Sequence, residues 1–268
     1  MIYYYSSPFD SFPSLYECNI RTMLISYAYK NELKKIEKHI KNDEYWQDKE
    51  KIKIMVDSGA FSIFNSGKQE IDVYEYKKFI EEFTESIYDK VSELTFVNLD
   101  VIPKDIKNKS DVDRAVETGI KNLNILSENM DKDMLMPVWH DGDSLEAIDY
   151  FVENGYNYIG IGMHFQYLLS DYLLATNRIY KNKDDIKKFR LHGLGLTKEK
   201  IIKQIPFYSI DSISYKKFYF NQKNTGQFWI GNKLLFSTEK IYNMERMLKQ
   251  VTDLWKIRNE DVENLAIY

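Results

Sequence analysis

The sequence predicts an α/β fold, a (β/α)8 barrel of the TIM type that forms a single domain over residues 1–268. Short apolar, β-branched or aromatic runs alternate along the chain with longer amphipathic stretches rich in Lys and Glu, which is typical of repeated βα units and a parallel sheet. The length of 268 residues and the hydrophobic fraction of 44% suit one barrel core. Because periodicity does not show whether a sheet closes, an open, doubly wound sheet stays an alternative.

Eight strands are expected where the short apolar runs occur. They cover residues 2–5, 23–27, 52–57, 94–101, 134–140, 158–162, 189–194 and 207–211. Helices are expected where apolar residues recur at a spacing of three and four. They cover residues 31–41, 72–88, 110–130, 144–154, 167–180, 198–204 and 238–257. After the last strand, aromatic runs at 218–220 and 228–230 flank Asn224-Thr225-Gly226, which predicts a β-hairpin insertion.

The composition limits the class of protein. Met1 is followed by Ile-Tyr-Tyr-Tyr without the basic start and apolar run of a secretory signal, and no window holds the ~18 apolar residues of a membrane span. The single cysteine, Cys18, excludes an internal disulfide and a Cys-rich zinc site. We therefore expect a cytoplasmic protein without a membrane partner. The net charge of −4 means that any polynucleotide must bind at a local basic patch.

Polar residues close four of the predicted strands. They are Asp57, Asp100, the pair His140-Asp141, and Asp211. Active sites of (β/α)8 barrels lie at the C-terminal ends of the strands, so we expect these side chains to meet at one mouth. Gathered carboxylates serve as nucleophile and general acid/base at a sugar carbon, bind a divalent cation, or cap the next helix. The residues alone leave these three interpretations open.

Glycines mark the ends of two further strands. Gly160 and Gly162 flank Ile161, and Gly193 and Gly195 flank Leu194. A residue without a Cβ lets a ligand approach the backbone, which suits a flat ligand such as a nucleobase, but glycine also permits tight turns and close packing. Both explanations stay open here.

At these positions the chain resembles the tRNA-guanine transglycosylase superfamily, barrel enzymes that exchange guanine in a polynucleotide for a 7-deazaguanine such as preQ0. Asp57-Ser58-Gly59-Ala60-Phe61 is similar to the Asp-Ser-Gly-Gly-aromatic signature of that family. The order and spacing agree over residues 23–215, and the further matches are Asp100, Gly160-Ile161-Gly162, His192-Gly193-Leu194-Gly195 and Asp211.

The resemblance implies a role for each matching residue. Asp211 would attack the anomeric carbon and form a covalent intermediate, and Asp57 would act as general acid/base. Asp100 would hydrogen-bond the base edge, while Phe61 and His192 would sandwich the base. The other residues expected to contact the substrate are Ser58, Gly59, His140, Gly160, Gly162, Gly193 and Ser212. No cofactor or metal is implied, because an aspartate pair suffices for substitution through an oxocarbenium-like state.

Departures from the family pattern favour DNA over tRNA as the substrate. The tRNA enzymes carry a cysteine-rich zinc subdomain, and this sequence has one Cys. Ala60 replaces the second glycine of the signature, His192 replaces a methionine, and His140-Asp141-Gly142 replaces a Gln-Gly. Asp211-Ser212-Ile213-Ser214-Tyr215 resembles the Asp-Ser-Thr-Ser-Trp run of small, zinc-free phage proteins that place 7-deazaguanines in DNA.

The expected partners are therefore DNA in preference to tRNA, a 7-deazaguanine base and a second copy of the chain. The basic and aromatic residues expected to contact nucleic acid are Lys216, Lys217, Tyr219 and Lys223. An ordinary edge hairpin protected by lysines is the alternative for this stretch. For the whole chain, the alternatives are a tRNA-guanine transglycosylase, a relative that only binds nucleic acid, and a metal-dependent hydrolase using Asp57, Asp100, His140 and Asp141.

Overall fold

The computed structural model describes most of the chain and all the strands named below. The described residues are 1–8, 15, 18–42, 52–66, 70–163, 168–181, 185–213 and 241–254. The predicted hairpin at 218–230 lies outside them. Within them, no helix is both long and apolar enough to cross a membrane.

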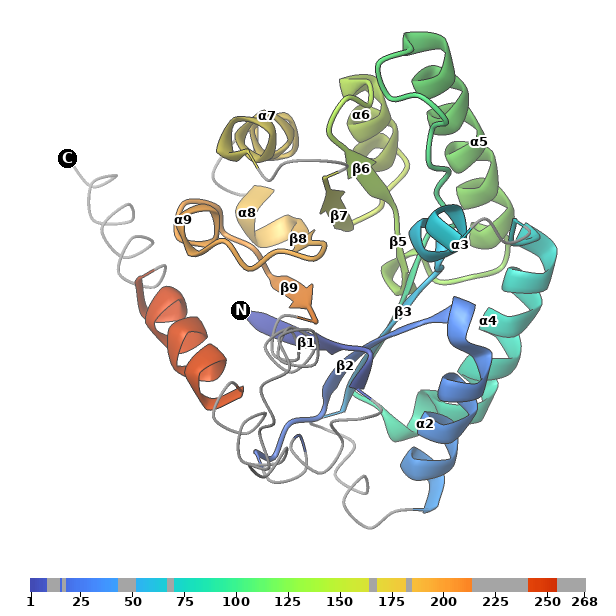
Figure 1. Ribbon diagram of the computed structural model, residues 1–268, viewed down its shortest axis with the longest axis vertical. Coiled ribbons are helices and arrows are strands. Elements are labelled where there is room, and N and C mark those ends of the chain that lie inside the picture. Colours follow the sequence, from blue (N-terminus) through green and yellow to red (C-terminus); the bar gives the residue numbers. More distant parts are fainter. Residues whose placement is uncertain are drawn as a thin grey trace, which may run out of the picture.

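The described residues form a parallel sheet of nine strands (Figure 1), in the order β5-β4-β3-β2-β1-β9-β8-β7-β6. Their bounds are β1 Ile2–Ser6, β2 Thr22–Ser26, β3 Lys53–Asp57, β4 Glu93–Val97, β5 Leu135–Met136, β6 Val138–His140, β7 Tyr158–Gly162, β8 Arg190–Gly193 and β9 Ser209–Ser212. The N-terminal strand β1 pairs with both β2 and β9, so the first and last described strands are neighbours.

The sheet is nearly closed, because β5 and β6 lie at its two ends and are separated in sequence only by Pro137. A proline has no backbone N–H to donate to a neighbouring strand. On one side the Asn98 N–H donates to the Met136 carbonyl at 2.9 Å, and on the other the Gly160 N–H donates to the Pro137 carbonyl at 2.8 Å. The single strand predicted at 134–140 is thus two short strands that bridge β4 and β7. The architecture is compatible with a TIM-like barrel.

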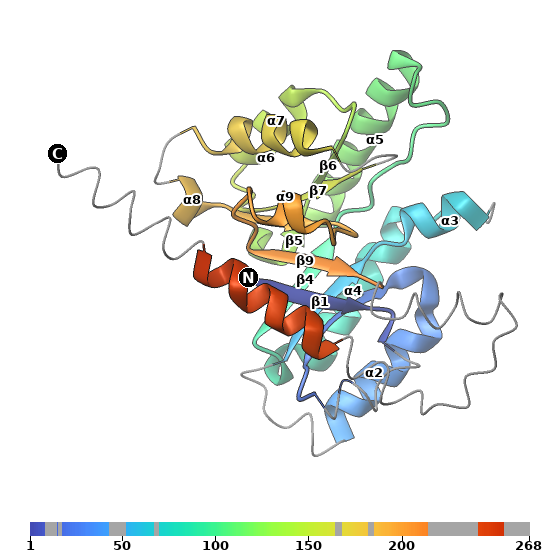
Figure 2. The ribbon, with the colours of Figure 1, turned by 60° about the vertical axis from the view of Figure 1, so that its left-hand side comes forward.

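Helices lie outside the sheet (Figure 1). Their bounds are α2 Lys30–Asn42, α3 Ala60–Ser66, α4 Val73–Ile87, α5 Lys109–Ser127, α6 Leu145–Glu153, α7 Leu169–Ile179, α8 Asp185–Lys188 and α9 Glu199–Ile202. A further helix covers residues 241–254 and runs beside β1 (Figure 2). Tyr5 of β1 donates to Glu245 Oε1 of this helix at 2.7 Å.

Helix α4 illustrates why these segments are helical. Asp72 caps its N-terminus by accepting from the Tyr74 and Glu75 N–H groups. Its buried side chains recur at a spacing of three and four, so one face packs on the sheet and the other meets solvent. They are Tyr76, Ile80, Phe83 and Ile87.

Apolar residues form two separate clusters on the two faces of the sheet. The larger fills the space between the sheet and the helices. The smaller joins residues from seven strands, which can meet only inside the barrel-like sheet. Its buried members are Tyr4, Leu24, Met55, Val97, Met136, Val138 and Tyr158. This inner cluster closes the interior beneath the carboxylates at the C-terminal ends of the strands.

Other parts of the described structure also differ from the predicted elements. The strand predicted at 94–101 ends at Val97. In the segment that follows, the Asn98 side chain donates to the Gly119 carbonyl and the Asn122 side chain donates to the Leu99 carbonyl. Helix α3 occupies residues that were expected to form a connection.

Candidate active site

The structure places four of the predicted site residues at the C-terminal end of the parallel sheet. Asp57 is the last residue of β3, His140 is the last of β6, and Asp211 lies in β9. Asp100 lies in the loop that follows β4. Because all the paired strands run parallel, the four side chains share one end of the sheet.

Asp57 has an environment that favours its neutral form. Burial and the nearby charge of Asp100 raise its pKa to about 7, and Asp211 adds to this repulsion. Hydrogen bonds from Ser26 and from the Gly59 N–H, 3.1 Å from Oδ2, offset the rise only in part. At neutral pH, Asp57 is therefore poised both to give and to take a proton.

Asp211 is surrounded by hydrogen-bond donors instead. Its Oδ2 accepts from the Ser6 hydroxyl at 2.7 Å, and its Oδ1 accepts from the Gly195 N–H at 2.8 Å. The His192 Nε2 lies 3.1 Å from the same Oδ1. Asp211 is only 7% exposed, so these three polar contacts replace the water that a carboxylate would otherwise bind.

The two aspartates thus have opposite surroundings within one site. A carboxyl group with its pKa raised to about 7 suits a general acid, whereas a carboxylate held by the donors Ser6 and Gly195 and by a contact with His192 stays oriented for attack on an electrophile. Substitution at a sugar carbon uses one carboxyl group of each kind.

Asp100 and His140 form a second polar group next to this pair. The His140 Nε2 lies 3.3 Å from Asp100 Oδ2, and its Nδ1 lies 3.6 Å from Asp143 Oδ2. Burial alone would lower the pKa of His140, but the hydrogen bond to Asp143 and the charge of Asp100 raise it. Gly162 makes room for this ring, since a Cβ there would lie 2.8 Å from His140 Cδ2.

The Asp57-Ser58-Gly59 turn is fixed by close packing against the end of β2. Gly59 has φ +86°, and a Cβ there would lie 2.7 Å from the Ala28 Cβ and 2.8 Å from the Ser26 Oγ. Only glycine satisfies both constraints without strain. Ser58 is fully buried, with its Oγ 3.5 Å from Asp100 Oδ1. This turn therefore holds the Asp57 carboxyl beside Asp100.

A cavity of about 410 Å³ opens beside Asp100, between α3, the start of α4 and α5. Its size falls in the range of small-ligand pockets, and most of its walls are apolar. Residues from the wall include Ala60, Ile63, Phe64, Ile71, Leu99 and Val101. The nearby Phe61 is 59% exposed, whereas His192 is fully buried beneath Asp211. The expected sandwich of a base between these two rings stays a prediction.

Gly160 and Gly193 have packing partners in the structure. A Cβ on Gly160 would lie 3.2 Å from Val138 Cγ2, and a Cβ on Gly193 would lie 2.8 Å from Leu196 Cδ2. Ser212 is buried and accepts a hydrogen bond from the Tyr3 hydroxyl through its backbone carbonyl. Side-chain packing therefore accounts for the two glycines, and contact of all three residues with a substrate stays a prediction.

Several residues that contact Asp211 or its neighbour His192 were not predicted. Ser6 is a polar residue at the end of an apolar strand, the same signal that identified the aspartates. Ser209 and Tyr158 contact His192 only because β7, β8 and β9 are in register, which periodicity does not show.

The predicted contacts to nucleic acid lie outside the described residues. They are Lys216, Lys217, Tyr219 and Lys223.

Among the residues that the structure describes, no group of three or more His, Cys, Asp or Glu side chains is arranged to hold a metal ion. Comparison with known proteins adds no assignment of the site, since neither a protein-family model nor a curated sequence matches this chain.

Proposed function

We propose that this protein is a base-exchange transglycosylase of the tRNA-guanine transglycosylase type, built on a (β/α)8 barrel. It replaces guanine in a polynucleotide, DNA in preference to tRNA, with a 7-deazaguanine such as preQ0. The observation that carries the proposal is the contrast between Asp57, whose pKa is raised to about 7, and Asp211, which accepts from Ser6 and Gly195 and contacts the His192 Nε2. The sequence motifs that contain both residues supply the substrate class.

In the first half of the reaction, a bond forms between an Asp211 carboxylate oxygen and C1′ of the target nucleotide. The bond between C1′ and the guanine nitrogen breaks, its electron pair goes to the base, and protonated Asp57 gives the base a proton. In the second half, the incoming base loses a proton to Asp57 and attacks C1′. The C1′–oxygen bond breaks, and its electron pair returns to the Asp211 carboxylate.

Recognition of the base belongs to Asp100 and His140 in this proposal. A carboxylate accepts from ring and amino N–H groups, and an imidazole N–H donates to a carbonyl oxygen. The His140 Nε2 lies 3.3 Å from Asp100 Oδ2, so the base exchanges this contact for hydrogen bonds of its own N–H and carbonyl groups with the two side chains. The target nucleotide must leave its stack to reach them.

The test is incorporation of labelled guanine or preQ0 into polymer. The protein is mixed separately with DNA and with tRNA, using wild type, Asp211→Asn and Asp57→Asn. As a matched control we choose Asp113→Asn, since Asp113 lies on α5 in an exposed ion pair with Lys109. We expect incorporation into DNA by wild type and control, and a loss of at least about a thousandfold in Asp211→Asn.

Each other outcome would change the proposal in a defined way. Incorporation into tRNA alone would replace the DNA substrate. No incorporation into either polymer, together with binding that Asp211→Asn leaves unchanged, would indicate a protein that only binds nucleic acid. Hydrolysis that a chelator abolishes and a divalent ion restores would indicate a metal-dependent hydrolase.

A further inference from the structure

We infer that His192, Ser209 and Tyr158 form a one-way chain of hydrogen bonds that holds Asp211 Oδ1 as an acceptor and leaves Oδ2 as the reacting oxygen. The three side chains are positioning residues, since they act through Asp211. The inference rests on the proposed function for its role in the reaction, but the chain itself rests on geometry alone.

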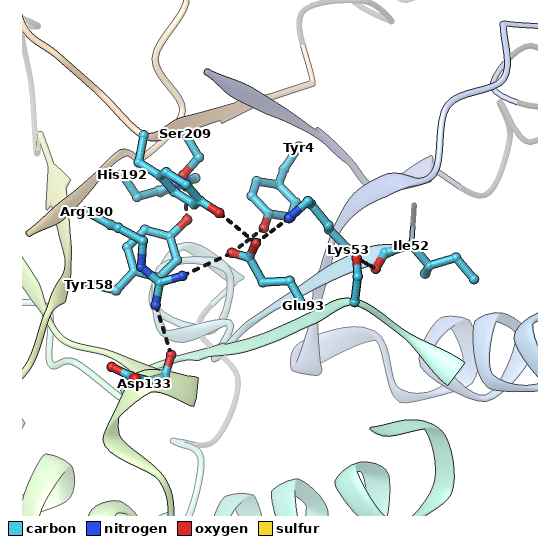
Figure 3. A network of polar contacts seen from close by, with 11 residues as sticks. Tyr4, Ile52, Lys53, Glu93, Asp133, Tyr158, Arg190, His192 and Ser209 are labelled. Atoms are coloured by element: carbon cyan, nitrogen blue, oxygen red, sulfur yellow. Dashed lines mark hydrogen bonds and ion pairs between the residues drawn. The ribbon is translucent and has the colours of Figure 1, made fainter. Parts of the chain in front are cut away.

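The chain consists of three consecutive contacts. The His192 Nε2 lies 3.1 Å from Asp211 Oδ1, the His192 Nδ1 lies 2.6 Å from Ser209 Oγ, and the Ser209 Oγ lies 2.5 Å from the Tyr158 hydroxyl. Figure 3 shows Tyr158, Ser209 and His192 close together. All three side chains are fully buried, so water does not compete for these contacts.

Only one direction of donation satisfies a neutral histidine in this chain. A carboxylate only accepts, so His192 carries its proton on Nε2 and its Nδ1 must accept. Ser209 then donates to Nδ1, and its oxygen accepts from Tyr158. Burial raises the pKa of Tyr158 well above its usual value, so this phenol keeps the proton that it donates.

The far end of the chain is anchored at the opposite end of the barrel-like sheet. The Arg190 guanidinium lies 4.5 Å from the centre of the Tyr158 ring, and the Tyr208 ring meets Tyr158 edge-on at 5.5 Å. Tyr208 donates to Glu93 Oε2 at 2.8 Å. These contacts fix the Tyr158 ring, which fixes the hydroxyl on which Ser209 depends (Figure 3).

The two oxygens of Asp211 are therefore not equivalent. Among the residues that the structure describes, Oδ1 accepts from both His192 and Gly195, whereas Oδ2 accepts from Ser6 alone. Oδ2 keeps an uncommitted lone pair and forms the bond to C1′, while the C1′–base bond breaks and its electron pair leaves with the base. When the C1′–Oδ2 bond later breaks, the pair returns to a carboxylate whose Oδ1 is already stabilised by two donors.

The first test reads the His192 tautomer directly and needs no activity. Protein labelled with ¹⁵N-histidine is studied by NMR at pH 8, where an ordinary imidazole is neutral, and the His192 signals are assigned by their loss in His192→Gln. We expect a ring protonated on Nε2 only. A ring protonated on Nδ1 only, or on both nitrogens, would overturn the inference whatever the reaction is.

The second test measures kcat and KM for base exchange in Ser209→Ala and Ser209→Thr. The alanine variant leaves the buried His192 Nδ1 without a donor, and we expect it to slow exchange by about tenfold to a hundredfold without a matching rise in KM. The threonine variant keeps a hydroxyl and should restore most of the rate. Equal rates in wild type and Ser209→Ala would contradict the proposed role of the chain.

A third variant tests the chain with a smaller change, in case the buried Ser209 variants do not fold. Tyr158→Phe keeps the ring between Arg190 and Tyr208 and removes only the donor, so we expect slower exchange with an unchanged KM. Its matched control is Tyr150→Phe, which removes an exposed hydrogen bond to Asn124 and should exchange at the wild-type rate. If wild type exchanges no base, the proposed function fails, and the tautomer measurement still decides whether the chain exists.

Discussion

The carboxyl group of Asp57 is held in a site that penalises its charge. Burial and the charge of Asp100 raise its pKa to about 7, and the hydrogen bonds from Ser26 and Gly59 do not compensate. In the unfolded chain the same group has an ordinary pKa near 4. The folded state therefore binds one more proton than the unfolded state between about pH 4 and pH 7. Asp57 therefore lowers the free energy of unfolding as the pH rises from about 4 to about 7.

Asp57→Asn should therefore stabilise the protein while abolishing exchange. The gain in free energy of unfolding should be near zero at pH 4, grow between pH 4 and pH 7, and level off at about 2–4 kcal/mol above pH 7. Urea unfolding of wild type and variant across this pH range measures it, with Asp113→Asn as the exposed control. A gain that does not change with pH would show that the pKa of Asp57 is not raised.

At the scale of one element, β7 supports the site because its last residue is a glycine that leaves space for a neighbouring ring. Gly162 closes this strand, and a Cβ there would lie 2.8 Å from His140 Cδ2 and 3.0 Å from His140 Nε2. The His140 ring cannot retreat without losing its contacts to Asp100 and Asp143. The identity of Gly162 is thus explained by the position of His140.

Gly162→Ala should weaken base exchange by displacing His140, and it should destabilise the fold by about 1–3 kcal/mol through overpacking. Gly119→Ala is the matched control, because Gly119 lies in α5 with its nearest neighbour atom 3.8 Å from the new Cβ. An alanine in that helix should stabilise by up to about 1 kcal/mol. The measurements are the thermal unfolding and the base-exchange rates of both variants. Similar effects of the two substitutions would argue against the packing of Gly162 on His140 as the explanation.

The elements show how far the sequence predicts the fold and where it does not. Apolar runs that end in aspartate locate β3 and β9 because burial and polarity change sharply there. The break at Pro137 has a visible signal, since proline cannot donate to a neighbouring strand. The contact of His192 with Ser209 depends on the pairing of β8 with β9, and that register is a three-dimensional property which no local pattern contains.

At the scale of the whole molecule, the N-terminal end of the barrel-like sheet is held together by one acidic side chain. Glu93 of β4 accepts from Lys53 of β3 at 2.6 Å and from Tyr4 of β1 at 3.2 Å (Figure 3). Tyr208 donates to it at 2.8 Å, and Arg190 of β8 lies 3.7 Å away. Glu93 thus joins strands from both halves of the chain. Its contact with Arg190 crosses the interior, because β4 and β8 are not neighbours in the sheet.

Glu93→Gln should destabilise the whole fold, because Lys53 and Arg190 lose their shared countercharge while remaining mostly shielded from water. Breaking a buried ion pair in this way costs about 3 kcal/mol, measured as the free energy of unfolding in urea. Glu82→Gln is the matched control, since Glu82 pairs with Lys78 on the exposed face of α4 and should change stability by less than about 0.5 kcal/mol. Adding Lys53→Met to Glu93→Gln should cost less than the sum of the two single changes, because the charge left unpaired by the first substitution is removed by the second. Additive losses would show that Glu93 does not pair with Lys53 through this charge.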